Sequence, residues 1–192
     1  MNRPVRGFTL IELLVVVALI GIMASIAVPS FTSFISNYRA TSAINDFLQG
    51  VTLTRGEALK RGRRVTMLPN LPDAARTPSV TGSWANGWTI FVDLNGNQTL
   101  DSTEVVIFKH GDLPASTTVT APVGSTTTFN NANYVAFDGT GYPRTIGGGQ
   151  LGGGVVLTDV IAANTSRRTL CLANFGRPRI VKDAPSETCA SG

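Results

Sequence analysis

The sequence is poor in the residues that enzymes and metalloproteins most often use. His110 is the only histidine, there are only two cysteines, and no C-x-x-C pair occurs. A zinc site built from Cys and His ligands is therefore not indicated, and no nucleophile with a neighbouring base is evident. We expect a protein that is not an enzyme and that carries no cofactor and no metal ion.

Charge is scarce too, and one region lacks it almost entirely. Glu12 is the only charged residue among residues 8–28. A helix of this length is about 31 Å long, which is enough to cross the hydrocarbon core of a membrane. We predict a transmembrane helix over residues 8–28. Because an unpaired carboxylate costs roughly 2.5–3.5 kcal/mol at the centre of a membrane, Glu12 should have a cationic partner.

Acidic residues are absent from residues 1–7, which contain Arg3 and Arg6. Positive charge favours a cytoplasmic location for this end of the chain and translocation of the remainder. No small-residue cleavage site follows the apolar run before Pro29, so an ordinary secretory signal is not indicated. A simple signal anchor, in which Glu12 lies near the membrane surface, is one interpretation.

A helical pattern resumes beyond Pro29, although proline removes one backbone hydrogen bond from a helix and kinks it. One face of this pattern carries Ile44, Phe47, Leu48, Val51, Arg55, Ala58 and Leu59. We predict one helix from residue 8 to about residue 61, bent near Pro29, in which residues 29–61 are an amphipathic continuation. Gly62 is expected to end this helix.

Residues 62–192 are predicted to form a β-rich periplasmic domain. Runs of aromatic and β-branched residues predict strands at residues 65–68, 87–93, 104–110, 117–120, 126–130, 134–138, 155–158, 169–173 and 179–182. A long helix followed by many short strands predicts an α+β fold, with the helix packed on a mostly antiparallel sheet.

The two cysteines, Cys171 and Cys189, both lie in the last part of the sequence. In an exported chain we expect them to form a disulfide, which would close the C-terminal tail and stabilise the fold by about 3 kcal/mol. A shared metal ion is the alternative, but the sequence supplies no further ligands of the usual kind.

The segment from Arg6 to Glu12, RGFTLIE, resembles the class III leader of type IV pilins and pseudopilins. The resemblance implies that a prepilin peptidase cleaves after Gly7 and methylates the new amine of Phe8. It also implies that this cationic amine neutralises Glu12 of a neighbouring subunit, and that the helix packs with other pilins. The chain would be a single-pass protein of the inner membrane, exposed on the pilus and cell surface after assembly.

Four later features resemble the GspH/FimT group of minor pilins and pseudopilins, and FimT and FimU in particular. They are the segments RGEALKRGRRVTM, NGWTIFVDLNGN and TLCLANFGRPRIV and the distal cysteine pair. The resemblance implies a pilin-like fold and a role in a filament. Its structural alternatives are a FimU-like minor pilin for pilus assembly and a GspH-like pseudopilin of a type II secretion system.

The segment Gly176–Arg179 reads GRPR and matches the G-R-x-R motif with which FimT-type minor pilins bind DNA in natural transformation. Arginines two apart on an extended segment project to one face, and Pro178 excludes a helix interior. We predict sequence-independent contacts with double-stranded DNA from Arg177, Arg179, Lys182, Arg167 and Arg168. The alternative is a solvated edge strand that uses charge to resist aggregation.

Two other polar segments are candidates for binding sites. Asp93–Glu104 spaces its oxygen atoms as a calcium loop does, but Gln98 stands where such loops require glycine. We favour a polar hairpin there. The basic run Lys60–Arg64 resembles a nucleic-acid patch, yet such runs are usually the solvated end of a helix.

Overall fold

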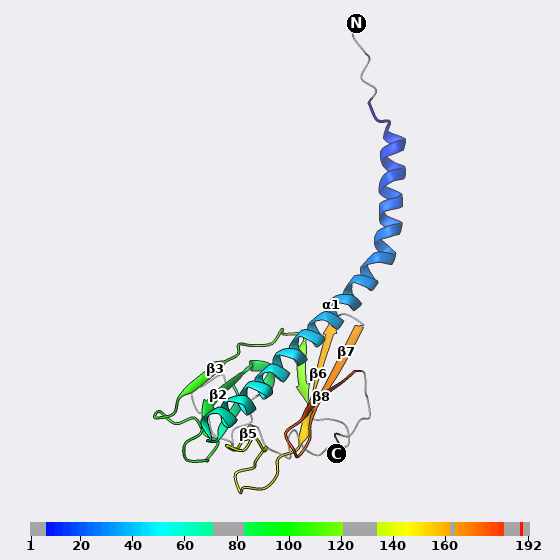
Figure 1. The fold of residues 1–192 in the computed structure, drawn as a ribbon. Coiled ribbons are helices and arrows are strands. Elements are labelled where there is room, and N and C mark those ends of the chain that lie inside the picture. The colour runs from blue at the N-terminus through cyan, green and yellow to red at the C-terminus, as the bar shows by residue number, and fades with distance from the viewer. Residues whose placement is uncertain (1–6, 71–82, 121–133, 162–163, 183–188, 190–192) are drawn as a thin grey trace.

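A computed structural model describes residues 7–70, 83–120, 134–161, 164–182 and 189. It has the predicted α+β fold, in which one long helix, α1 (Leu10–Arg61), packs on two four-stranded antiparallel sheets (Figure 1). The predicted strand at residues 126–130 and most of the predicted leader lie outside the described residues.

Both ends of α1 have capping interactions that the sequence encodes locally. Thr9 and Glu12 form a capping box, in which the Thr9 hydroxyl accepts from the Glu12 N–H and the Glu12 carboxylate accepts from the Thr9 N–H at 2.9 Å. Gly62 ends the helix in the left-handed conformation, with φ 61°, as predicted.

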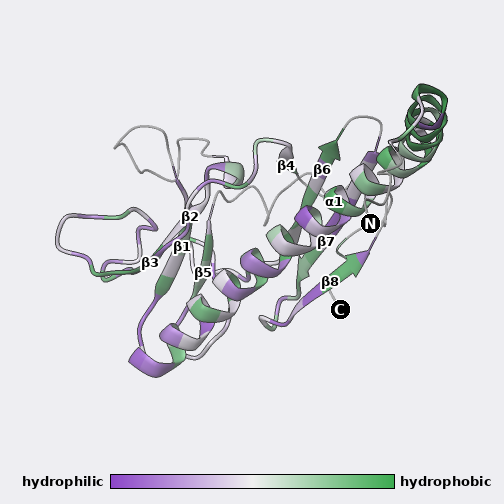
Figure 2. Cartoon of the chain, turned by 90° about the horizontal axis from the view of Figure 1, so that it is seen from above, coloured by the Kyte–Doolittle hydropathy of each residue, from purple (hydrophilic) through white to green (hydrophobic). Residues whose placement is uncertain are grey.

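The two halves of α1 have different surroundings. Every side chain from Gly7 to Val28 is exposed, and this apolar part projects away from the β-rich domain (Figures 1 and 2). Of the described helices, α1 alone is long and apolar enough to cross a membrane. Figure 1 also shows α1 bent between its projecting part and the part that lies on the sheets.

The residues of α1 that were predicted to share one packed face are buried or half-buried in the structure, with one exception. Ile44, Phe47, Val51 and Ala58 are buried. Leu48 and Arg55 are half-buried. The prediction was wrong for Leu59, which is 51% exposed because it lies at the rim of the packed face.

The first sheet has the strand order β3-β2-β1-β5. Its strands are β1 (Val65–Pro69), β2 (Trp88–Val92), β3 (Val106–Lys109) and β5 (Val135–Phe137), and a short 3-10 helix, η1 (Trp84–Asn86), precedes β2. β1 and β2 are buried along their whole length, and their threonines, Thr66 and Thr89, donate hydrogen bonds to Asp93 and Asn70.

The second sheet has the order β4-β6-β7-β8. Its strands are β4 (Thr117–Thr120), β6 (Gly153–Ile161), β7 (Asn164–Leu172) and β8 (Pro178–Lys182). β6 and β7 are longer than the predicted strands because buried polar residues interrupt their apolar pattern. Asp159, for example, accepts hydrogen bonds from the hydroxyls of Ser116 and Thr117.

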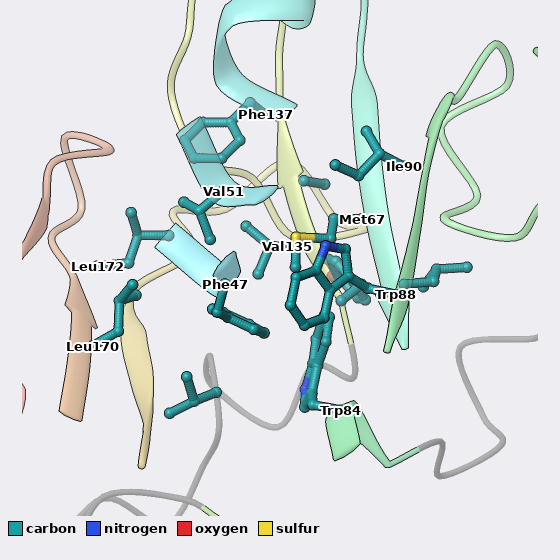
Figure 3. Close-up of a cluster of buried hydrophobic side chains, with 14 of the residues drawn as sticks. Phe47, Val51, Met67, Trp84, Trp88, Ile90, Val135, Phe137, Leu170 and Leu172 are labelled. Atoms are coloured by element: carbon teal, nitrogen blue, oxygen red, sulfur yellow. The ribbon is translucent and has the colours of Figure 1, made fainter. Parts of the chain in front are cut away.

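The core lies between α1 and the two sheets. Phe47 of α1 makes edge-to-face contacts with Trp84 and Trp88, with ring centroids 5.1 Å apart in both pairs (Figure 3). Leu170 and Leu172 of β7 belong to the same cluster. Because α1 contacts strands of both sheets, its packed half joins them into one domain.

Two glycines of α1 test this packing. A Cβ atom at Gly50 would lie 2.7 Å from Nε1 of the buried Trp88, whereas one at Gly56 would meet nothing within 4 Å. We expect Gly50→Ala to lower the free energy of unfolding by about 1–3 kcal/mol through overpacking. Gly56→Ala should raise it by up to about 1 kcal/mol because alanine favours the helix. Thermal unfolding of the two variants measures the difference, and equal effects would contradict this packing.

Candidate nucleic-acid interface

The GRPR segment begins in the turn that joins β7 to β8. The Ala173 N–H donates to the carbonyl of Arg177 at 3.1 Å, and the Gly176 N–H donates to the carbonyl of Ala173 at 2.8 Å. Gly176 has φ 76°, which completes a three-residue hairpin loop of the common kind. A Cβ atom there would also lie 3.0 Å from the carbonyl oxygen of Gly141. The turn therefore requires the glycine of the motif.

Strand register places the two motif arginines on one face of the second sheet. Arg179 pairs with Cys171, whereas Ile180 pairs with Leu170 of the core. Because side chains alternate along a strand, Arg179 points away from α1. Arg177 lies two residues earlier, and both arginines are exposed. The predicted common face agrees with this register.

Of the three predicted supporting residues, Arg167 alone shares the face of the two motif arginines. Arg168 is only 7% exposed and donates to the Arg167 carbonyl at 2.7 Å and to Asn37 of α1 at 3.4 Å. We therefore exclude Arg168 from the residues that could contact DNA. Lys182 is exposed but pairs with Arg168, so it points to the α1 side of the sheet. Half-buried Arg167 shares the face of Arg179, about 13 Å away along β7.

The basic run at the end of α1 is mostly engaged within the molecule. Lys60 and Arg61 both pair with Glu57, at 3.4 and 2.7 Å. The Arg61 hydrogen bond is the main cause that lowers the pKa of Glu57. Arg64 donates to the carbonyl of Gly96 at 3.0 Å. These contacts support the interpretation of Lys60–Arg64 as the solvated end of a helix rather than as a nucleic-acid patch.

Arg55 has a role that the sequence did not reveal. Its Nη1 donates to the carbonyl oxygen of Gly176 at 2.9 Å, which ties the hairpin turn to the packed half of α1. The two residues are separated by 121 positions in the sequence, and only the fold brings them together. Arg55 thus positions the arginine hairpin and does not extend its surface.

A second turn supports the hairpin from beside it. The Asp138 carboxylate accepts hydrogen bonds from Thr140, from the Tyr142 N–H and from Arg144 Nε, the last at 2.8 Å. Partial burial alone would raise the pKa of Asp138, but the bonds from Thr140 and Arg144 outweigh it and lower the pKa to about 2. The carboxylate therefore stays ionised at neutral pH and keeps closed the turn whose Gly141 adjoins Gly176.

The predicted disulfide between Cys171 and Cys189 is present, with Cα atoms 5.3 Å apart. It lies on the face of Arg179 because Cys171 is the strand partner of that arginine. The sulfur of Cys189 fits above Gly154 of β6, where an added Cβ would lie only 2.6 Å from it. A glycine inside a strand often marks such a close approach, and this signal could have identified Gly154 from sequence.

A pocket of about 500 Å³ lies beside the loop that joins β7 to β8. We call it the hairpin pocket. It is lined by Cys171, Leu172, Ala173, Phe175, Arg177, Pro178, Arg179 and Cys189. The disulfide and the two motif arginines thus border one cavity.

The proposed calcium loop is closed by its own hydrogen bonds. Asp93 accepts from the Thr66 hydroxyl and from the N–H groups of Gly96 and Gln98. Glu104 accepts from the N–H groups of Leu94 and Asp101. Within the described part of the chain, no group of three His, Cys, Asp or Glu side chains could hold a metal ion. The arrangement favours the polar hairpin.

Comparison with known families gives two matches. The prokaryotic N-terminal methylation motif matches residues 2–28, and the family described as Type II transport protein GspH matches residues 43–176. The second match covers more than half of the chain.

Individual relatives resemble the chain over shorter stretches. Fimbrial protein Q of Moraxella bovis is 40% identical over 63 residues, which are 30% of this chain and 40% of that protein. A fimbrial protein of Dichelobacter nodosus is 30% identical over 99 residues, 52% of this chain and 58% of that protein. The chain spans about half the length of the curated relatives it matches.

Among solved structures, the type IV minor pilin FimU of Pseudomonas aeruginosa superimposes with a TM-score of 0.49 and 17% identity. The superposition covers 82% of this chain and 98% of that chain.

The Cys171–Cys189 disulfide should stabilise the folded domain at the β7–β8 hairpin. Its loop spans 18 residues, for which chain entropy predicts about 3 kcal/mol. We expect reduction to lower the melting temperature, and Cys171→Ala/Cys189→Ala to have a similar effect. Calorimetry with and without reductant measures this. Thiol titration of protein purified from periplasm is the control, since two free thiols there would contradict the bond.

Proposed function

Since the chain belongs to the GspH family of type IV pilin-like proteins, we propose that it is a FimT-like minor pilin that binds extracellular DNA for uptake in natural transformation. Proteins of this family are structural and not enzymes. The methylation motif implies processing by a prepilin peptidase and assembly with other pilins. An apolar N-terminal helix is typical of pilins, which are anchored in the inner membrane before assembly.

In this proposal the chain has four parts. Residues 1–7 are the leader, removed by cleavage after Gly7. Residues 8–28 span the membrane and later lie in the filament core. Residues 29–61 continue the helix onto the sheets, and residues 62–192 form the periplasmic domain. The exposure of every side chain from Gly7 to Val28 supports this division, because such an apolar surface needs lipid or other subunits to cover it.

The observation that carries the DNA proposal is the exposed pair Arg177 and Arg179 on one face of the hairpin. Their guanidinium groups can each fork onto phosphate oxygens. Such contacts hold the DNA backbone without reading its bases. The pair also faces away from α1, so DNA and neighbouring subunits can be bound at the same time. Arg167 lies on the same face and extends it, whereas Lys182 points to the α1 side of the sheet.

A purely structural subunit is the second candidate. It is favoured by the match to the Type II transport protein GspH, which covers most of the globular part of the chain. In that case Arg177 and Arg179 would give the sheet a charged edge that prevents aggregation. The subunit would be a FimU-like pilin or a GspH-like pseudopilin, and it would not bind DNA through this edge.

Processing is the first test of the proposal. We expect the mature chain to begin at N-methylated Phe8 and to retain the whole apolar helix, because the cleavage site precedes it. Mass spectrometry of protein extracted from membranes identifies the first residue. A chain that begins after Val28 would instead show that residues 8–28 are a removable signal.

DNA binding is the second test. We expect full-length protein in neutral detergent to bind duplex DNA with little sequence preference and with an affinity that falls linearly with salt on logarithmic axes. Arg177→Ala/Arg179→Ala should weaken binding and flatten the salt dependence by up to about two units, one for each arginine. Fluorescence anisotropy at several salt concentrations measures both effects.

The matched control for this test is Lys60→Ala/Arg63→Ala, which also removes two exposed positive charges, but from the end of α1. It should leave DNA affinity near the wild-type value. In a competent host only the hairpin variant should reduce transformation, while pili still assemble. A folded hairpin variant with wild-type DNA affinity would refute DNA binding and leave the structural subunit.

A further inference from the structure

We propose that the hairpin pocket takes an unpaired nucleobase, so that the protein prefers single-stranded DNA to intact duplex. This inference rests on the proposed DNA-binding function and specifies the form of DNA that the same site selects. Its basis is the composition of the pocket, in which an exposed aromatic ring, an apolar floor and two arginines meet.

Phe175 supplies the aromatic ring. It lies in the loop of the β7–β8 hairpin, is 57% exposed, and is not part of the hydrophobic core cluster. Its loop is nonetheless held firmly, since Gly176 is bonded to Ala173 and to Arg55 of α1. An exposed ring on a loop whose backbone is held by hydrogen bonds can serve as a stacking platform for a flat ligand.

The floor of the pocket suits the flat face of a base. Of its lining residues, the disulfide and Ala173 share the face of Arg179, and neither has a side-chain hydrogen-bond donor. A site of this kind accepts any of the four bases, because all have similar faces and differ at their edges. The volume of about 500 Å³ is sufficient for a base and its sugar.

The arginines provide the charge that a nucleic-acid ligand needs. Arg177 and Arg179 line the same pocket and are separated by two residues of extended chain, about 6.6 Å. This spacing allows them to contact the phosphates on either side of one inserted base. In intact duplex the base is stacked and paired, so duplex would receive the arginine contacts alone.

The test compares a short single strand of mixed sequence with a blunt duplex of the same sequence, both bound to full-length protein in neutral detergent. We expect Phe175→Ala to lower the affinity for the single strand about tenfold and to leave the duplex affinity unchanged. The salt dependence should not change, because no charge is lost. Phe175→Trp should retain the preference, and its added fluorescence should be quenched by the single strand.

Phe108→Ala is the control, because Phe108 is also an exposed phenyl side chain but lies on β3 of the other sheet. It should bind both forms of DNA as wild type does. If Phe175→Ala binds the single strand as wild type does while Arg177→Ala/Arg179→Ala binds it more weakly, the nucleobase site is refuted and the DNA-binding function stands. If Arg177→Ala/Arg179→Ala binds both single-stranded and duplex DNA as wild type does, the DNA-binding function itself is refuted. Impaired pilus incorporation of Phe175→Ala with normal DNA binding would assign the pocket to a neighbouring subunit and overturn the proposal.

Discussion

The structure depends on one continuous helix that meets two different environments. From Ser36 onward, α1 buries one face against both sheets, and Phe47 fills the space between them. From Gly7 to Val28, by contrast, α1 and the residues before it present an exposed apolar surface whose one charged side chain is Glu12. The first environment holds the domain together, and the second requires lipid or other subunits.

The arginine hairpin is attached to this helix at several points. Arg55 bonds the turn directly, the Asp138 turn adjoins it through Gly141, and the disulfide fixes the outer face of β7. The contacts explain how a surface loop can present two exposed arginines in a defined geometry. They also place the proposed ligand site on the side opposite the helix. In the proposed function, assembly and DNA binding would therefore use separate surfaces of one small domain.

The sequence was sufficient for the features that depend on local patterns. The helix, its glycine end and most strands follow from apolar periodicity, and the cysteine pair follows from composition. The full length of β6 could not be predicted, because Asp159 is buried against hydroxyls of distant residues. The burial of Arg168 was missed for the same reason, since its partner Asn37 lies 131 residues away. Charge in a sequence shows that a group is costly to bury, but not whether the fold supplies a partner.

We propose that other subunits cover the exposed apolar half of α1 in the filament, with the amine of Phe8 opposite Glu12 of a neighbouring subunit. The most direct measurement is the incorporation of Glu12→Ala into pili. This variant should insert into the membrane, since it loses a costly charge, but should be depleted from filaments. Ser25→Ala is the control, because the Ser25 hydroxyl donates within the helix, to the Ile22 carbonyl at 2.7 Å. Normal incorporation of Glu12→Ala would contradict the proposed pairing between subunits.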